Sequence, residues 1–578
     1  MRMNVSYLVV VRWLQKREVQ CLLLLACASV LIHLFLIPRL NIVEDESAYV
    51  QDALQITPSF LPFRDFGPVK GPFFLFVLKA WEIVFGTSLL SVRMFSSLAH
   101  VASIPLLYVL GAYLTRSKVV GAVAAAWWAL TPVVVSLTTN AMHFPVELFC
   151  IFASFVCITH GTSKKYLFLA ALLAIAAFLT RVSAAALLPV FLCLLWWRQD
   201  RRAAYTHFFT SFIAILLVVA GVVYVFYGWP KTAFFFNLEA LAIANGQRAV
   251  YAAANTSSIS ETILTVFQPL WMEGWALAIF AFCVPFLHMK PSRNRWYMLA
   301  AITCLFVWVS ITVYPWRTSS LPIGSSYAIF TSYALPVLAI GTLFLLALFS
   351  QAYSLSAKRL FLAGSLWVVG SYVFYKGWGR SPTPFYPLES MPVFALFAGT
   401  SVASLVGVFR NTKIVITRIL IILFFVISAI DLVHAYRTML IRQYRGTVVS
   451  SAAEETAEFL RSKTRSGTNI FTAQPIYPFL AGRPLYKGFT HPGWYLSERA
   501  GYLPTSMRQL FLPDLDVLAQ MVNSDVDWIV VDWRTEDVYF KAGVPSTEPL
   551  RQLLFDEFEQ VAQITNPASR DIKIFHRK

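Results

Sequence analysis

The chain has 578 residues, of which 58% are hydrophobic and only 13% are charged, about half the charged share of an ordinary soluble domain. A soluble protein of this composition could not cover its surface with polar groups, so most of the chain is expected to use lipid as its solvent. The formal net charge is +17, but the basic residues fall in short clusters between apolar runs. That pattern is typical of membrane-topology signals, so we expect no nucleic-acid partner.

The apolar runs predict an all-α polytopic membrane bundle of about thirteen transmembrane helices. The first run has no small-residue cleavage site after it, which predicts an uncleaved anchor. Lys and Arg gather in the short segments on one side of the predicted helices, which puts the N-terminus in the cytoplasm and the C-terminal region outside it. The predicted spans are, in chain order, 21–37, 95–114, 119–138, 144–160, 165–180, 183–197, 207–227, 268–288, 296–314, 328–350, 359–376, 390–409 and 413–433.

Two predicted outer loops, residues 39–94 and 228–266, are too long to be simple connections. Within the first, residues 73–85 carry Lys79 and Glu82 three positions apart with apolar residues around the rest. This pattern favours a helix that lies in the membrane interface. The second loop is expected to contain another interfacial helix. Because long ordered loops on one face of a bundle usually carry function, the site is expected on this outer face.

After the last apolar run, no further stretch is apolar and long enough to span a membrane. This change predicts a membrane domain, residues 1–433, and an extracytoplasmic domain, residues 434–578. Helices and short buried strands alternate in the second domain, which predicts a small α/β fold. The predicted helices are 452–463 and 550–561, and the predicted strands are 469–471, 528–531 and 572–575.

Three acidic residues, Glu44, Asp45 and Glu46, stand directly after the first predicted span. Acids beside a membrane are costly unless they are solvated, paired or used in chemistry. A solvated loop is one interpretation, and a reactive site is the other. The rest of the loop favours the reactive site, because aromatic, basic and proline-bearing elements follow in a definite order before the second span.

This order resembles the first outer loop of the GT-C glycosyltransferases that use polyprenyl-phosphate sugars, and by pattern most closely the protein O-mannosyltransferases and the lipid A aminoarabinose transferases. In these families an Asp-Glu pair and an aromatic residue open the loop, and a Lys-Pro-Pro-type turn, a Phe-Gly dipeptide and an arginine follow. The similar elements here are Asp45-Glu46, Tyr49, Lys70-Gly71-Pro72, Phe85-Gly86 and Arg93. Later in the chain, Phe178 to Arg181 resembles the basic turn after the fifth span, and Ala481-Gly482-Arg483 resembles a tripeptide of the outer domain.

The resemblance implies an enzyme that transfers a hexosyl or pentosyl group from a polyprenyl-phosphate donor to an acceptor hydroxyl outside the cytoplasm, with inversion at the anomeric carbon. The acceptor would be a glycan, a lipid or a protein. The implied location is the bacterial inner membrane, where the enzyme would serve the cell envelope, and we expect it to act as a monomer.

Such a reaction needs a carboxylate that takes the proton of the acceptor hydroxyl as it attacks. Asp45 is the predicted base, and Glu46 and Glu147 are the other predicted catalytic acids. Cations would stabilise the negative charge on the departing phosphate, and Lys70 and Arg181 are preferred for that role. The full set of predicted substrate-binding residues is Tyr49, Arg64, Asp65, Lys70, His143, Arg181 and Arg317.

Two positions depart from the family pattern. Val69 stands where the aminoarabinose branch has a metal-binding glutamate, so no metal site is predicted, and Glu44 or Asp45 would be the ligand if a divalent ion were used. The second family acid, at the start of the fourth span, has no clear match, and Glu147 and His143 both stand near its place.

The cations and polar residues also have structural interpretations. Arg181 could neutralise a turn between two spans, and Lys70 could extend from the interface to water. Arg64 and Asp65 could pair with each other. In the same way, His143 could be an interfacial histidine and Arg317 could sit among lipid headgroups.

Three other functions compete with the glycosyltransferase, and one of them is a non-catalytic scaffold whose C-terminal domain binds a partner. A transporter or flippase of lipid-linked sugars predicts ionisable residues near span centres and weak internal repeats, whereas the charges here concentrate at span ends and in the outer loops. A polysaccharide ligase or polymerase would place its catalytic loop late in the chain rather than after the first span.

Overall fold

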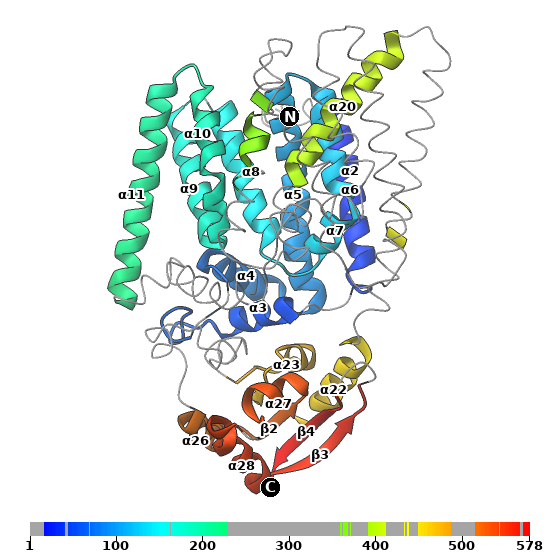
Figure 1. Ribbon diagram of the computed structural model, residues 1–578, viewed down its shortest axis with the longest axis vertical. Coiled ribbons are helices and arrows are strands. Elements are labelled where there is room, and N and C mark those ends of the chain that lie inside the picture. Colours follow the sequence, from blue (N-terminus) through cyan, green and yellow to red (C-terminus); the bar gives the residue numbers. More distant parts are fainter. Residues whose placement is uncertain are drawn as a thin grey trace, which may run out of the picture.

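The computed structural model describes most of the N-terminal half of the chain and most of the C-terminal domain. Helices gather in one bundle, and a small α/β domain lies at one end of it (Figure 1). The predicted spans between residues 229 and 358, and the second outer loop, lie outside the described residues. The described residues are 17–40, 44–66, 68, 70–161, 163–228, 359–360, 362–367, 370, 391–411, 433, 436–437, 449–486, 515–542, 544–566 and 570–578.

Three described helices are long and apolar enough to cross a membrane: α2 (Arg17–Leu36), α5 (Leu89–Thr115) and α11 (Arg201–Tyr227). Each corresponds to a predicted span. The expected total of about thirteen is not tested by the described residues. The helices between α5 and α11 are α6 (Lys118–Leu130), α7 (Pro132–Thr139), α8 (Phe144–His160), α9 (Lys164–Thr180), η1 (Val182–Leu187) and α10 (Leu188–Trp196).

Proline explains where a predicted span differs from the helices that form. The expected helix over 119–138 is two helices, α6 and α7, which meet at Thr131. Pro132 has no backbone N–H and cannot continue the ladder of α6, but its fixed φ suits the first position of a new helix. The expected helix over 183–197 is likewise divided, and Pro189 stands in the first turn of its α-helical part, α10.

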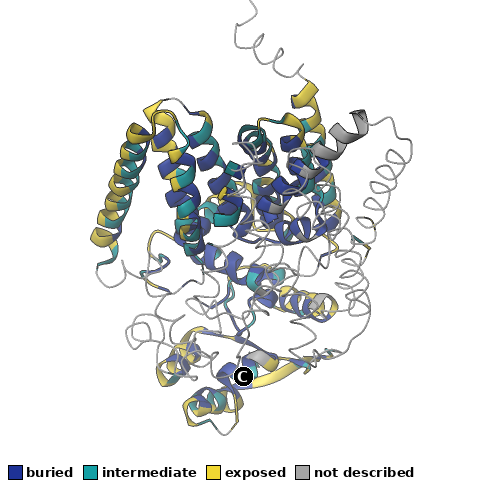
Figure 2. Ribbon diagram, turned by 45° about the horizontal axis from the view of Figure 1, so that its top comes forward, coloured by how far each residue is buried: buried dark blue, intermediate teal, exposed yellow. Residues whose placement is uncertain are grey.

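The bundle is built around α5, which contacts α2, α6 and α8, while α9 packs between α8 and α11. The helix α20 (Met391–Asn411) packs against α6. On the far side, α11 exposes a band of large apolar side chains, seen as the yellow face of that helix in Figure 2. This face suits contact with lipid. Its exposed residues include Leu217, Val218, Val222, Val225 and Phe226.

One end of the bundle carries an exposed lysine, Lys118, and a largely buried arginine, Arg198. Lys118 Nζ lies 2.6 Å from Glu18 Oε1, and both side chains are largely exposed. Arg198 donates to the carbonyl oxygens of Ile158 and Gly161, at the C-terminus of α8, where a cation complements the helix dipole. Lys118 and Arg198 both stand in the short basic segments that the charge pattern assigns to the cytoplasmic side.

The helices α3 (Glu44–Gln55) and α4 (Pro72–Phe85) lie across the other end of the bundle (Figure 1). The expected helix over 73–85 is therefore present as α4. By contrast, no helix is predicted over α3, although three acids in a first turn complement the positive end of a helix dipole. The two helices contact each other, and α4 also contacts α5 and α9.

The C-terminal domain has a four-stranded sheet in the order β1-β2-β4-β3. Strand β1 is parallel to β2, and the other two pairings are antiparallel. Apolar clusters cover both faces of the sheet, which is the predicted small α/β fold. Its elements are α22 (Val449–Lys463), β1 (Ile470–Phe471), α23 (Ile476–Ala481), α26 (Leu515–Asp525), β2 (Trp528–Val531), α27 (Trp533–Tyr539), η4 (Pro545–Thr547), α28 (Glu548–Glu557), β3 (Phe558–Ile564) and β4 (Ile572–Arg577).

One prediction in this domain is wrong. The helix expected over 550–561 ends at Glu557, and residues 558–561 begin β3. The pairing of β3 with β4 shifts its register between Gln560 and Ala562. A bulge of this kind interrupts the two-residue alternation by which a strand is recognised in sequence.

Candidate functional site

The helix α3 presents Asp45 and Tyr49 on one face. The two residues are four positions apart, and the Tyr49 hydroxyl donates a hydrogen bond to Asp45 Oδ2 at 2.9 Å. Tyr49 is fully buried, whereas Asp45 is partly exposed. The tyrosine therefore fixes one oxygen of a carboxylate that keeps access to its surroundings.

Lys70 reaches the same place from the turn before α4. Its Nζ lies 5.2 Å from the centroid of the Tyr49 ring, in the range of a cation–π contact. A Cβ on Gly71 would collide with the backbone carbonyl oxygens of Leu179 and Thr180. The missing side chain lets this turn lie directly against the end of α9 and brings Lys70 close to the residue that follows α9.

That following residue is Arg181. Its guanidinium carbon lies 4.6 Å from the centroid of the Phe144 ring, and its Nη1 lies 3.9 Å from Glu147 Oε2. Glu147 is fully buried in the first turn of α8 and accepts a hydrogen bond from Ser183 Oγ at 3.1 Å. The acid and the serine thus hold Arg181 at the edge of the bundle.

His143 lies in the turn before α8, where the charges of both cations act on it. It is buried, and its ring meets that of Tyr49 edge-on at a centroid distance of 5.7 Å. Burial lowers the pKa of His143 well below its usual value, and the charges of Lys70 and Arg181 lower it further. His143 is therefore neutral at physiological pH, and both cations act on it.

The structure thus brings together six of the predicted site residues from four separate segments: α3, the turn before α4, the start of α8 and the end of α9. Of the other predicted residues, the Glu44 side chain and Arg317 lie outside the described residues. The six are Asp45, Tyr49, Lys70, His143, Glu147 and Arg181.

Glu46 has different surroundings from its neighbour Asp45. It forms a two-pronged ion pair with Arg93, in which both N–O distances are 2.8 Å and both side chains are fully buried. The backbone N–H of Ala141 donates to the same carboxylate. Arg93 also donates to the carbonyl oxygens of Ile37 and Leu40. The pair ties α3 to α5 and to the end of the first span.

Arg64 and Asp65 pair with each other at 2.7 Å in an exposed turn. Asp65 also accepts from the backbone N–H of Leu61, and Arg64 donates to the carbonyl oxygen of Ser59. These contacts account for the shape of the turn between α3 and α4. They favour the structural interpretation of both residues.

No group of three or more His, Cys, Asp and Glu side chains that could hold a metal ion is found in the described part of the chain. The acids at the end of the bundle that carries α3 are distributed instead among separate partners: a tyrosine for Asp45, an arginine for Glu46 and a serine for Glu147.

Sequence reasoning missed the role of two residues. Ser183 was not considered, although its place two residues after Arg181 is a signal that could have been used. Gly71 was noted only as part of a motif, and its contact with the end of α9 depends on a residue more than 100 positions away.

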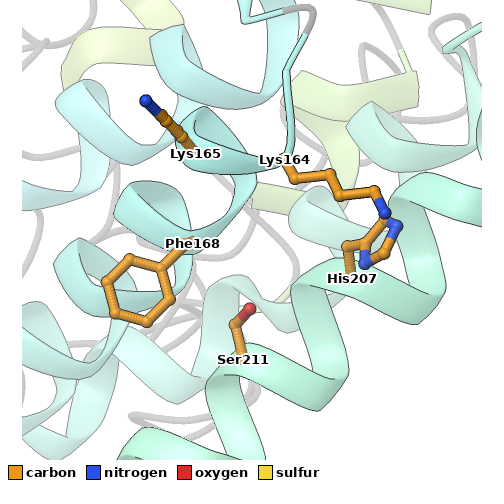
Figure 3. A pocket seen from close by; sticks show the side chains of 5 residues that line it. All are labelled: Lys164, Lys165, Phe168, His207 and Ser211. Atoms are coloured by element: carbon orange, nitrogen blue, oxygen red, sulfur yellow. The ribbon is translucent and has the colours of Figure 1, made fainter.

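A cavity of about 330 Å³ lies elsewhere, between α9 and α11, and none of the predicted site residues lines it (Figure 3). Lys164 and Lys165, from α9, and His207, from α11, contribute to its lining. The cavity lies beside Lys164, where α9 begins, whereas Arg181 follows the other end of that helix. Phe168 and Ser211 complete its lining.

Comparison with known proteins gives one family match and several similar folds. Residues 69–226 match the family described as dolichyl-phosphate-mannose-protein mannosyltransferase. Over the residues that it covers, this match confirms the predicted resemblance to glycosyltransferases that use polyprenyl-phosphate-linked donors. No curated protein matches the sequence.

Several solved structures are similar to nearly the whole chain, among them AglB and ArnT. The oligosaccharyltransferase AglB from Archaeoglobus fulgidus, in complex with an inhibitory peptide and a dolichol-phosphate, is 13% identical, with 97% of this chain and 74% of that chain covered and a TM-score of 0.49. ArnT from Cupriavidus metallidurans, bound to undecaprenyl phosphate, is 12% identical, with 96% of this chain and 97% of that chain covered and a TM-score of 0.47.

Proposed function

We propose that this chain is a membrane glycosyltransferase that moves a sugar from a polyprenyl-phosphate donor to an acceptor hydroxyl on the outer face of the bacterial inner membrane. One observation carries the proposal: a partly exposed carboxylate, Asp45, lies in one cluster with two cations. Tyr49 donates a hydrogen bond to Asp45, and the ring of Tyr49 contacts Lys70. Lys70 and Arg181 both lower the pKa of the buried His143. An acid and two cations at the outer end of an apolar bundle suit a hydroxyl acceptor and a lipid-borne phosphate.

Asp45 would act as the general base. It takes the proton of the acceptor hydroxyl, whose oxygen forms a bond to the anomeric carbon while the bond from that carbon to the phosphate oxygen breaks. The hydrogen bond from Tyr49 occupies Oδ2 and leaves Oδ1 for the acceptor. A single attack on the face opposite the phosphate inverts the configuration at the anomeric carbon.

Lys70 and Arg181 would bind the leaving group. The phosphate departs with the electron pair of the broken bond, and the two cations stabilise the negative charge that it gains. In this scheme Glu147 and Ser183 orient Arg181 rather than exchange protons. Neutral His143 would stand near the two cations without adding a third positive charge.

Glu46 takes no part in this chemistry in our proposal. Both of its oxygens accept from Arg93, and one also accepts from the backbone of Ala141. A carboxylate engaged in this way is poorly available as a base. Its work is to fix α3, and thereby Asp45, to the bundle. We likewise leave Arg64 and Asp65 out of the substrate-binding set, and no step uses a metal.

The test is a deletion strain from which membrane lipids are extracted and analysed by mass spectrometry. We expect a polyprenyl-phosphate sugar to accumulate and one glycan, lipid or protein modification to disappear. The wild-type gene should reverse both changes, whereas Asp45→Asn should retain less than about one hundredth of the transfer rate, the scale of general-base catalysis.

Asp200→Asn is the matched control. Asp200 is an acid near the opposite end of the bundle, where it pairs with Arg198 at 2.8 Å, and its loss should leave transfer unchanged. If Asp45→Asn, present at wild-type amounts, restored full transfer, Asp45 would not be the base. If the deletion strain accumulated no lipid-linked sugar, the donor class would be wrong.

A further inference from the structure

The helix α3 is buried on two opposite faces. At 100° per residue, Asp45, Tyr49 and Asp52 share one face, while Val50 and Gln51 lie on the other side. The five consecutive residues from Tyr49 to Ala53 are all fully buried. A helix with a polar sequence that is covered all round must have a partner for each face.

The C-terminal domain is the partner of the second face. The Gln51 side chain makes two hydrogen bonds to it: its Nε2 donates to the carbonyl oxygen of Arg483 at 3.3 Å, and its Oε1 accepts from the backbone N–H of Leu485 at 3.2 Å. The amide is thereby used as both donor and acceptor by a segment 432 residues further along the chain.

The segment that Gln51 contacts is itself hydrogen-bonded to strand β1 of the sheet. The Ile470 N–H donates to the carbonyl oxygen of Pro484, and the Tyr486 N–H donates to the carbonyl oxygen of Ile470, so residues 484–486 run beside β1. The Arg483 side chain donates to the hydroxyl and the carbonyl oxygen of Thr464, just after α22. The two hydrogen bonds of Gln51 therefore connect α3 to a segment that is tied to β1 and α22 rather than to an isolated loop.

Apolar contacts surround the two hydrogen bonds. Phe479, from α23, packs in one cluster with Val50, Val92 and Ala141. This cluster includes α3, the start of α5 and the turn before α8. In Figure 1, α23 lies directly beside α3, and the two helices are in contact.

We propose that Gln51 is a positioning residue, through which the C-terminal domain holds α3 and sets the place of Asp45. The Glu46–Arg93 pair anchors one side of the helix, and Gln51 anchors the other. The part of this inference that concerns Asp45 rests on the proposed function, whereas the part that concerns α3 does not.

The first experiment measures the helix itself. Gln51→Met keeps the size of the side chain but leaves the partly buried carbonyl oxygen of Arg483 and the buried N–H of Leu485 without this partner. In the full-length protein in lipid nanodiscs, we expect the amides of residues 47–55 to exchange with deuterium roughly 5- to 30-fold faster than in the wild type. Gln552→Met, on an exposed position of α28, is the control and should leave this exchange unchanged.

The second experiment measures transfer, with the lipid extract of the deletion strain as donor and the membranes of that strain as acceptor. Per mole of folded enzyme, kcat of Gln51→Met should fall about tenfold while KM for the donor stays within about twofold, since Lys70 and Arg181 lie outside α3. Gln51→Asn keeps an amide that is one methylene too short and should show the same pattern in a milder form. It also serves if Gln51→Met does not fold.

The outcomes separate the two parts of the inference. Wild-type exchange in both Gln51 variants would overturn the role of the C-terminal domain in holding α3. Faster exchange with unchanged kcat would overturn the link to Asp45. If no lipid-linked sugar accumulates in the deletion strain, the proposed function fails, but the exchange experiment still decides whether the domain holds the helix.

Discussion

The two ends of the helical bundle use charged residues in opposite ways. At the end that carries α3, Glu46, Arg93 and Glu147 are fully buried. At the other end, the Lys118 and Glu18 side chains that form an ion pair are 71% and 45% exposed. Buried charges carry a large desolvation cost unless they are paired or used, whereas exposed ones cost little. The buried charges at the first end therefore require a defined geometry, whereas the exposed Lys118–Glu18 pair does not.

The largest expected effect comes from breaking the buried pair. Arg93→Met leaves the Glu46 carboxylate buried without its cation, which should destabilise the protein by about 3–5 kcal/mol. Thermal denaturation of the purified protein in detergent measures the loss. Lys118→Met, at the exposed end, is the control and should leave the melting temperature unchanged.

The double variant Arg93→Met with Glu46→Met makes this test sharper. It removes both charges and should recover much of the lost stability, because no isolated buried charge remains. Equal melting temperatures for Arg93→Met and Lys118→Met would contradict the proposal that the buried charges contribute more to stability than the exposed ones.

A smaller effect is expected from Gly71→Ala. The added Cβ would meet the carbonyl oxygens of Leu179 and Thr180, so the turn must move away from α9 and carry Lys70 away from Arg181. We expect a loss of about 1–3 kcal/mol in stability, and a loss of transfer larger than that stability loss explains.

The control for this change is Gly221→Ala in α11. A Cβ there meets no atom within 4 Å, and alanine is the better helix former. Both variants are compared by melting temperature and by restoration of the missing modification. A Gly71→Ala protein with wild-type transfer would show that the close approach of the two segments is not needed.

The smallest effect concerns Glu82, a buried acid of α4 whose oxygens have no hydrogen-bond partner among the described residues. Burial raises the pKa of Glu82 to about 8, although Lys79 partly opposes this. The pKa of Glu82 is higher in the folded state than its ordinary value near 4.5. The stability that the bound proton contributes is therefore complete below pH 4.5 and is lost as the pH rises through 8.

Wild-type protein should therefore lose stability as the pH rises from about 5 to about 8, and Glu82→Gln should lose less. We expect the drop in melting temperature between these two pH values to be about 1–3 °C smaller in the variant. Melting curves at both pH values measure it. Glu559→Gln, at an exposed position of β3, is the control and should keep the wild-type drop. The same pH dependence in wild type and Glu82→Gln would contradict the assignment.

Three of the spans and the helix over 73–85 could be predicted from the sequence, because they depend on local composition. Helix α8 was predicted to its first and last residues, since the run from Phe144 to His160 is apolar and bounded on both sides. Helix α3 could not be recognised by that criterion, because its polar sequence is buried by contacts with two distant regions.

The sequence points to candidate site residues more readily than to the side chains that contact them. The resemblance pointed to Glu46 and to Arg93, but nothing local shows that these two side chains, 47 positions apart, form a pair. Gln51 had no signal at all, because its partners are backbone atoms of residues 483 and 485. Sequence patterns identify residue types suited to chemistry, whereas long-range contacts decide which of two adjacent acids is available for it.

The covering of α3 by residues 479–485 has a consequence for how the protein is made. The helix leaves the ribosome early, with Val50 and Gln51 still uncovered, and its second partner is synthesised more than 400 residues later. Since domains form in the order of synthesis, a chain interrupted before that point would insert its helices yet leave α3 incompletely packed. Completion of the C-terminal domain would thus be the last step in the packing of α3.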